Sequence, residues 1–162
     1  MLILILMVYG AGCNSAKNAG GGSGTSMQGT WTVTGNLGSK AGPHTYQVKF
    51  VSSPCSVTTP VGTFSVQGPV CFIANNNSGQ GSISGAGVGG TGGQGVLVGV
   101  SSNPVPAGAT FNLLFVAGGN GNIVEFTGSG TVTGGTLTAT GSCSPNTPMC
   151  QGVSGTFSGK QQ

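Results

Sequence analysis

Side chains that could carry acid–base chemistry are almost absent from this chain of 162 residues. His44 is the only histidine, Glu125 is the only acidic residue, and there is no aspartate. General acid–base catalysis needs a group with a suitable pKa, and hydrolysis near neutral pH usually needs two such groups or a metal. His44 and Glu125 are the one candidate pair, and they lie in separate predicted strands. We therefore expect a protein that is not an enzyme and that needs no cofactor.

Both residues have simpler explanations than catalysis. His44 follows Pro43 at a loop-to-strand boundary, a position typical of an exposed histidine. Glu125 lies between Val124 and Phe126, so it faces solvent if those two apolar residues face the core. A buried acid that binds a ligand is the alternative for Glu125.

Other familiar chemical motifs are missing as well. Glycoside hydrolysis uses a pair of carboxylates, and this sequence has one acidic residue. The Gly-rich stretch at residues 89–93 lacks the lysine and the following helix of a phosphate-binding loop. The four basic residues are all lysines and are scattered, so we expect no nucleic-acid partner.

The chain begins with an apolar segment that ends at a cysteine. Residues 2–12 are too few to span a bilayer, which takes about 20 residues, and have the length of a signal-peptide core. Gly10-Ala11-Gly12-Cys13 resembles the bacterial lipobox, in which a signal peptidase cuts before the cysteine that carries the lipid. The resemblance implies a signal peptide at residues 1–12 and lipidation of Cys13. An ordinary secretory signal with an unrelated Cys13 is the alternative.

The segment after this cysteine is rich in small residues. Residues 20–24 read Gly-Gly-Gly-Ser-Gly and have nothing to bury, so residues 13–28 are predicted to form a flexible tether that carries the lipid at its start. Residues 29–160 then remain for a single domain, and this length is enough for one hydrophobic core.

Four further cysteines fit an exported protein. Cys55, Cys71, Cys143 and Cys150 allow three disulfide connectivities, of which we expect the two local pairs, Cys55–Cys71 and Cys143–Cys150. A four-cysteine zinc site is the competing interpretation. The chain has no C-x-x-C spacing, so we expect no metal.

Composition and periodicity predict an all-β fold. Only 3% of the residues are charged and 34 are glycine, without the repeat of collagen. Short runs alternate apolar and hydroxyl-bearing residues, as Thr30 to Thr34 do around Trp31 and Val33. No window shows a helical period, and glycine rarely leaves ten residues free for a helix.

Short connections between these runs predict antiparallel neighbours, because parallel strands need long crossovers. We expect about nine strands in an antiparallel meander closed into a small β-barrel, with the first and last strands paired. A β-sandwich is the alternative. The predicted inward-facing residues are Trp31, Val33, Tyr46, Val48, Phe50, Phe64, Val66, Val98, Phe111, Leu113, Phe115, Val124, Phe126, Val132, Leu137 and Phe157.

The complete layout resembles a family of small Gly/Thr/Ser-rich bacterial envelope lipoproteins. The similarity rests on the lipobox-like cysteine, the tether, the opening Gly29-Thr30-Trp31, the Ser53-Pro54-Cys55 phrase and Gly141-Ser142-Cys143 near the end. It implies a β-barrel domain at the cell envelope and no particular activity. Asn14 after the cysteine, where an Asp would resemble an inner-membrane signal, implies the outer membrane.

Two classes of function remain open. The first is a non-enzymatic envelope lipoprotein, anchored to the membrane by its lipid and monomeric, with a structural or surface-interaction role. The second is a barrel that binds a small molecule or glycan at its mouth, as lipocalins and streptavidin do. The candidate ligand-binding residues are Trp31, Tyr46 and Glu125. A hollow barrel interior would favour binding, and an interior filled by Phe and Val would favour the structural role.

Overall fold

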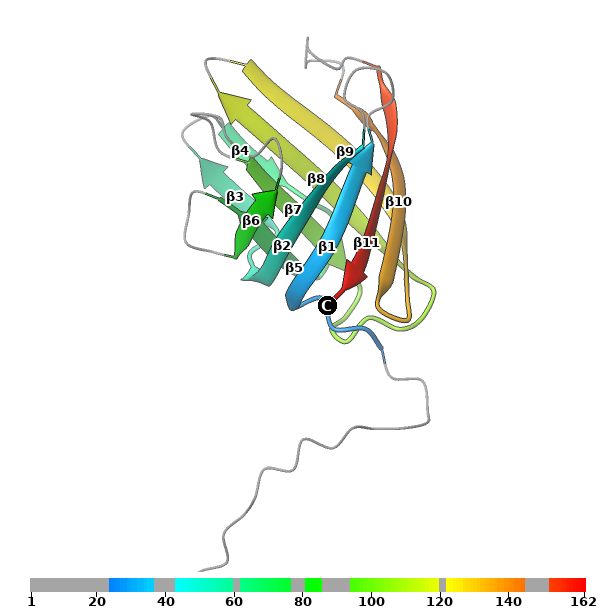
Figure 1. The fold of residues 1–162 in the computed structure, drawn as a ribbon. Coiled ribbons are helices and arrows are strands. Elements are labelled where there is room, and N and C mark those ends of the chain that lie inside the picture. The colour runs from blue at the N-terminus through cyan, green and yellow to red at the C-terminus, as the bar shows by residue number, and fades with distance from the viewer. Residues whose placement is uncertain are drawn as a thin grey trace, which may run out of the picture.

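The computed structural model describes residues 24–36, 43–59, 62–76, 81–85, 94–119, 122–144 and 152–162. The predicted signal peptide, Cys13 and most of the tether lie outside these residues. The described part forms strands and no helix, as the sequence predicts (Figure 1). The strands are β1 (Gly29–Asn36), β2 (His44–Ser53), β3 (Ser56–Thr59), β4 (Gly62–Ser65), β5 (Val70–Asn75), β6 (Ser82–Gly85), β7 (Gln94–Val100), β8 (Ala109–Gly119), β9 (Asn122–Thr133), β10 (Thr136–Cys143) and β11 (Ser154–Gln161).

Eight of these strands close into an antiparallel barrel, which confirms the predicted meander. Around the ring the order is β1, β2, β5, β7, β8, β9, β10 and β11, and each strand pairs antiparallel with the next. The ring is closed by the pairing of the first and last strands, in which Thr34 lies opposite Ser158. Figure 1 shows these two strands, blue and red, side by side.

Glycine turns set the hairpins of the barrel. β9 and β10 are joined by Gly134 and Gly135, whose φ angles of 57° and 74° fall in the left-handed region that hairpin turns need. β9 also approaches β10 closely at Gly130, which lies opposite Ala139. A Cβ on Gly130 would overlap the carbonyl oxygen of Thr138, so only glycine allows this close approach.

One strand of the wall is made of two pieces. β5 pairs with the end of β2 through Ser53 and Cys71, and β6 pairs with the middle of β2 through Val48 and Ile83. β5 and β6 therefore lie one after the other along the same edge of β2.

The barrel interior is packed with apolar side chains at one end, which we call the floor end. Trp31 is fully buried there, and its indole Nε1 donates a hydrogen bond to the carbonyl oxygen of Met27 at 3.1 Å. Met27 and Val105 are both fully buried, and Thr25 pairs with Val105 as an isolated bridge. These residues cover the floor end, so Thr25 and Met27, which lie within the predicted tether, pack against the barrel.

A second hydrophobic cluster lies outside the barrel wall. The β3–β4 hairpin covers the outer face of β5, β7 and β8, and it buries Leu97 and Leu114 there (Figure 1). Phe64 and Val66 belong to this outer cluster, so their predicted place inside the barrel is wrong. Period-2 alternation shows that one face of a strand is buried, but it does not show against which layer.

The predicted disulfide between Cys55 and Cys71 is confirmed. It joins the start of the hairpin to β5, with Cα atoms 5.2 Å apart. The bond therefore fastens the outer hairpin to the wall that it covers.

Candidate functional site: the hollow end of the barrel

The end of the barrel opposite the floor holds a hollow of about 230 Å³, which we call the cavity. It lies where β1 ends and where β2, β7 and β9 begin. The interior is thus divided: the floor end is filled, and the cavity end is not. The cavity is lined by Val33, Gly35, His44, Tyr46, Val48, Ile83, Gln94, Val96, Phe115, Ala117, Val124, Phe126, Thr156 and Phe157.

Side-chain alternation along the strands explains this lining. On β2, every second residue from His44 to Phe50 points inward, and burial increases along that series from exposed to 1%. The cavity's walls are aliphatic and aromatic, and its few polar groups come from His44, Tyr46, Gln94 and Thr156. Ligand sites of proteins commonly have this character, a mostly apolar hollow with a few placed polar groups.

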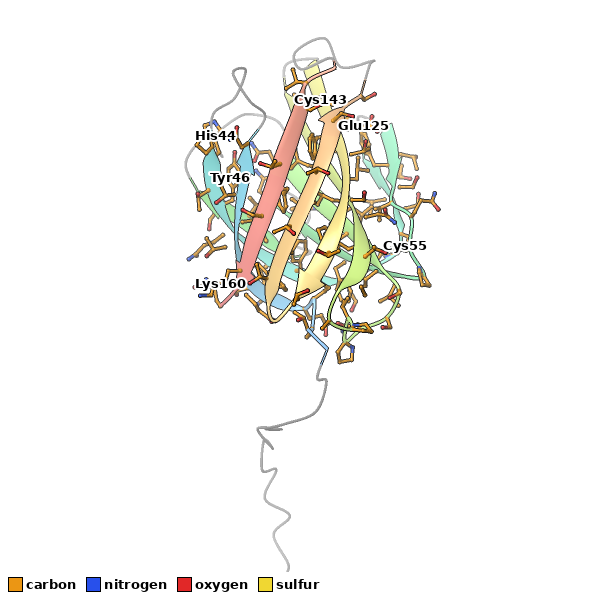
Figure 2. All side chains as sticks on the ribbon, turned by 90° about the vertical axis from the view of Figure 1, so that its right-hand side faces the viewer. His44, Tyr46, Cys55, Glu125, Cys143 and Lys160 are labelled. Atoms are coloured by element: carbon orange, nitrogen blue, oxygen red, sulfur yellow. A yellow bond between two sulfur atoms is a disulfide. The ribbon has the colours of Figure 1, made fainter. Side chains whose placement is uncertain are left out.

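Tyr46 is the most deeply placed of the ionisable groups in the cavity wall. Burial removes water from its ring and raises the pKa of its hydroxyl above 10.0, so the phenol stays neutral in ordinary conditions. Its ring lies 6.3 Å from that of His44, measured between centroids, and the two are tilted by 35°. In Figure 2 the two side chains extend from the same wall at the cavity end.

No charged side chain in the described part of the chain faces the interior. Lys49 and Lys160 are exposed, and Glu125 is half-buried on the outer side of β9, opposite Val116 of the outer face. Among the described residues, the cavity lining therefore contains no Lys or Glu side chain.

The structure brings together only part of the predicted ligand-binding set. Tyr46 lines the cavity. Trp31 lies in the filled floor, where it is fully buried and bonded to Met27. Glu125 faces out of the barrel, because its neighbours Val124 and Phe126 line the cavity.

His44 and Glu125 do not form a catalytic pair. They stand on β2 and β9, which are four strands apart in either direction around the ring. His44 points inward and Glu125 outward, and Figure 2 shows the two on opposite sides of the barrel. This placement leaves the expectation of a non-enzymatic protein standing as a prediction.

The remaining cysteines are only partly described. Cys143 is buried in the barrel core and is disulfide-bonded. Its predicted partner, Cys150, lies outside the described residues, so that pairing remains a prediction. Lipidation of Cys13 is likewise a prediction, since Cys13 lies outside them too.

Two further features bear on the chemistry of the described segments. Among them, no group of three or more His, Cys, Asp or Glu side chains is placed to hold a metal ion. None of them forms a helix with the length and apolarity needed to span a membrane.

A second hollow lies at the floor end, beside Ser26, Gly134 and Lys160. Its volume is larger, about 400 Å³, but it is shallow and polar. Its polar groups already bond to one another: Gly135 donates to Thr25 Oγ1 at 3.1 Å, and Gln161 Nε2 donates to the Ser26 carbonyl at 2.9 Å. The apolar cavity is therefore the better candidate for a site.

Sequence reasoning missed several cavity residues. Ile83, Gln94 and Ala117 line the cavity but are absent from the predicted inward-facing set. The alternation of Val96, Val98 and Val100 places Gln94 inward by register, and this is the one sequence signal that predicts it.

The chain matches no known protein family, and neither curated proteins nor solved structures include a match to it. The fold and the cavity therefore define its class by themselves: a small antiparallel β-barrel with one filled end and one hollow apolar end.

Proposed function

We propose that this protein is a non-enzymatic binding barrel that holds a small, mainly apolar molecule in its cavity. The observation that carries the proposal is the division of the interior. Protein interiors are normally packed to the density of organic crystals, with few voids larger than a water molecule. A hollow of about 230 Å³ between a packed floor and neutral walls is a departure from that rule.

The size and lining of the cavity support a ligand rather than trapped water. An engineered apolar cavity of roughly 150 Å³ stays dry and binds benzene. The present cavity is larger, and its lining is mostly apolar. A molecule somewhat larger than benzene fits this space.

The position of the floor supports a role at a membrane surface. Gly24, where the described chain begins, lies at the floor end beside Val105. We propose that Cys13 carries a lipid in the cell envelope, as the lipobox-like sequence implies. The cavity end would then face away from the membrane, toward a soluble ligand.

The binding proposal is tested with propylbenzene, a neutral molecule of a ring and a short chain. NMR of the full chain carrying Cys13→Ala, which takes no lipid, should show shifts in the methyl signals of Val48, Ile83 and Val96. Ala117→Phe places a ring in the cavity and should abolish the shifts. Ala107→Phe, the same change at an exposed position outside the cavity, should leave them intact. Shifts that are absent from the parent chain, or that persist in Ala117→Phe, would overturn the proposal.

The anchoring proposal has its own test. Radiolabelled palmitate supplied to cells that export the protein should enter the wild type and not Cys13→Ala. Cys143→Ala serves as a control, because Cys143 is buried and disulfide-bonded. Equal labelling of the wild type and Cys13→Ala would refute lipidation at this residue.

A further inference from the structure

The order of side chains along the cavity wall indicates the chemistry of the ligand. We infer that the ligand is a neutral amphipathic molecule: one ring or a short hydrocarbon chain, with a single uncharged polar group that hydrogen-bonds the Tyr46 hydroxyl. This inference rests on the proposed binding function and extends it by naming the ligand class and the residue that selects it.

Polarity changes with depth along β2. His44 is exposed, Tyr46 is half-buried and Val48 is 1% exposed, and all three line the cavity. β7 repeats the order, with half-buried Gln94 followed by Val96 at 2%. A molecule in this space meets hydrocarbon at depth and hydrogen-bonding groups near the opening. The complementary ligand has one apolar end and one polar end.

The Tyr46 hydroxyl is available to such a ligand. In the described part of the chain, its ring packs against His44 and the core, and its hydroxyl makes no hydrogen bond to protein. A half-buried hydroxyl that loses water gains from a partner, because an unpaired buried polar group is costly. Burial keeps the phenol protonated, so it can donate to a hydroxyl, ether or carbonyl oxygen.

The charged side chains of the described residues favour a neutral polar group over an ionic one. Lys49, Lys160 and Glu125 are the charged side chains of the described residues, and each stands on the outer face of the wall. A carboxylate or ammonium at the depth of Tyr46 would lose water without a described Lys or Glu side chain beside it, and that loss is unfavourable. A neutral polar group incurs a smaller penalty.

A matched series of four compounds, propylbenzene and three para-substituted derivatives of it, tests this inference. Propylbenzene, 4-propylphenol, 4-propylbenzoate and 4-propylbenzylammonium share the ring and chain and differ in the polar group. Calorimetry at pH 7.5 on the full Cys13→Ala chain should find 4-propylphenol the tightest. The two ions should bind at least about tenfold more weakly than the phenol.

Two variants test whether the Tyr46 hydroxyl makes the hydrogen bond to the ligand. Tyr46→Phe should weaken 4-propylphenol by about 3- to 10-fold, the effect of one neutral hydrogen bond, and leave propylbenzene unchanged. Thr138→Val removes a hydroxyl from the exposed outer face of β10 and should change neither affinity.

The outcomes separate the two proposals. If no compound binds, propylbenzene included, the binding function itself fails. If propylbenzene binds but an ion binds as tightly as the phenol, the neutral class is wrong. If Tyr46→Phe weakens both neutral compounds equally, or neither, the assignment to the Tyr46 hydroxyl is wrong.

Discussion

Tyr46 shows how much a single residue's setting depends on the shape of the barrel. Its alternation with Val48 and Phe50 predicts an inward side chain, and the structure has it there. Trp31 follows the same pattern on the neighbouring strand, yet it lies in the packed floor while Tyr46 lines a cavity. The two residues differ in their position along the barrel axis, which we call height. Height follows from the register between β1 and β2, in which Tyr46 lies opposite Val33 and Trp31 opposite Val48.

The raised pKa of Tyr46 predicts a loss of stability in alkali. The unfolded chain releases this proton near pH 10, while the folded protein still holds it, so the free energy of unfolding falls as the pH rises through that window. Below pH 10 the contribution is fully present. Urea titrations at pH 9, 10 and 11 should show a steeper fall for the wild type than for Tyr46→Phe. Parallel curves for the two proteins would contradict the prediction.

At the scale of the element, β7 contains a run of buried residues that one alternating buried face explains only in part. Residues 96–100 are all buried, whereas one buried face would leave every second residue exposed. Val96, Val98 and Val100 face the barrel interior, and Leu97 faces the β3–β4 hairpin. Gly99 has no side chain because Gln67 and Gly68 cross directly over it. The sequence contains both hydrophobic faces, but the hairpin that covers the outer one is distant in sequence and carries no signal of its destination.

The outer hairpin should loosen without the barrel opening. Cys55→Ala with Cys71→Ala removes a cross-link between residues 16 apart, worth about 3 kcal/mol by chain entropy. Because β3 and β4 pair only with each other, hydrogen exchange should become faster in residues 56–66. The β8–β9 amides pair within the closed ring and should keep their protection. Equal loss of protection in both regions would show that hairpin and barrel unfold as one unit.

At the scale of the whole molecule, closure was predictable and the cavity was not. Many short strands with few charges to protect an edge favour a closed sheet, and the matching Gly-Thr-apolar phrases around Trp31 and Phe157 indicate which strands meet. How completely the side chains fill the barrel could not be predicted. The volume left inside a barrel depends on strand tilt, stagger and the sizes of side chains that meet across it. The sequence also gave no sign that Met27, in a glycine-rich segment, folds back to cover the floor.

The division of the interior predicts opposite effects for one substitution at two heights. Ala117→Phe adds a ring where space exists, so the free energy of unfolding should rise by about 0.5–2 kcal/mol, as cavity-filling changes commonly give. Ala139→Phe adds the same ring to the packed interior, where Ala139 is 5% exposed, and should cost about 1–3 kcal/mol. Ala107→Phe, at an exposed turn, should stay within about 0.5 kcal/mol of the wild type. Chemical denaturation of the three variants measures the free energy of unfolding of each. If Ala117→Phe lowers it as much as Ala139→Phe does, the barrel is filled from end to end. A gain at Ala117 together with lost propylbenzene binding would show that the added ring occupies the space in which the ligand binds.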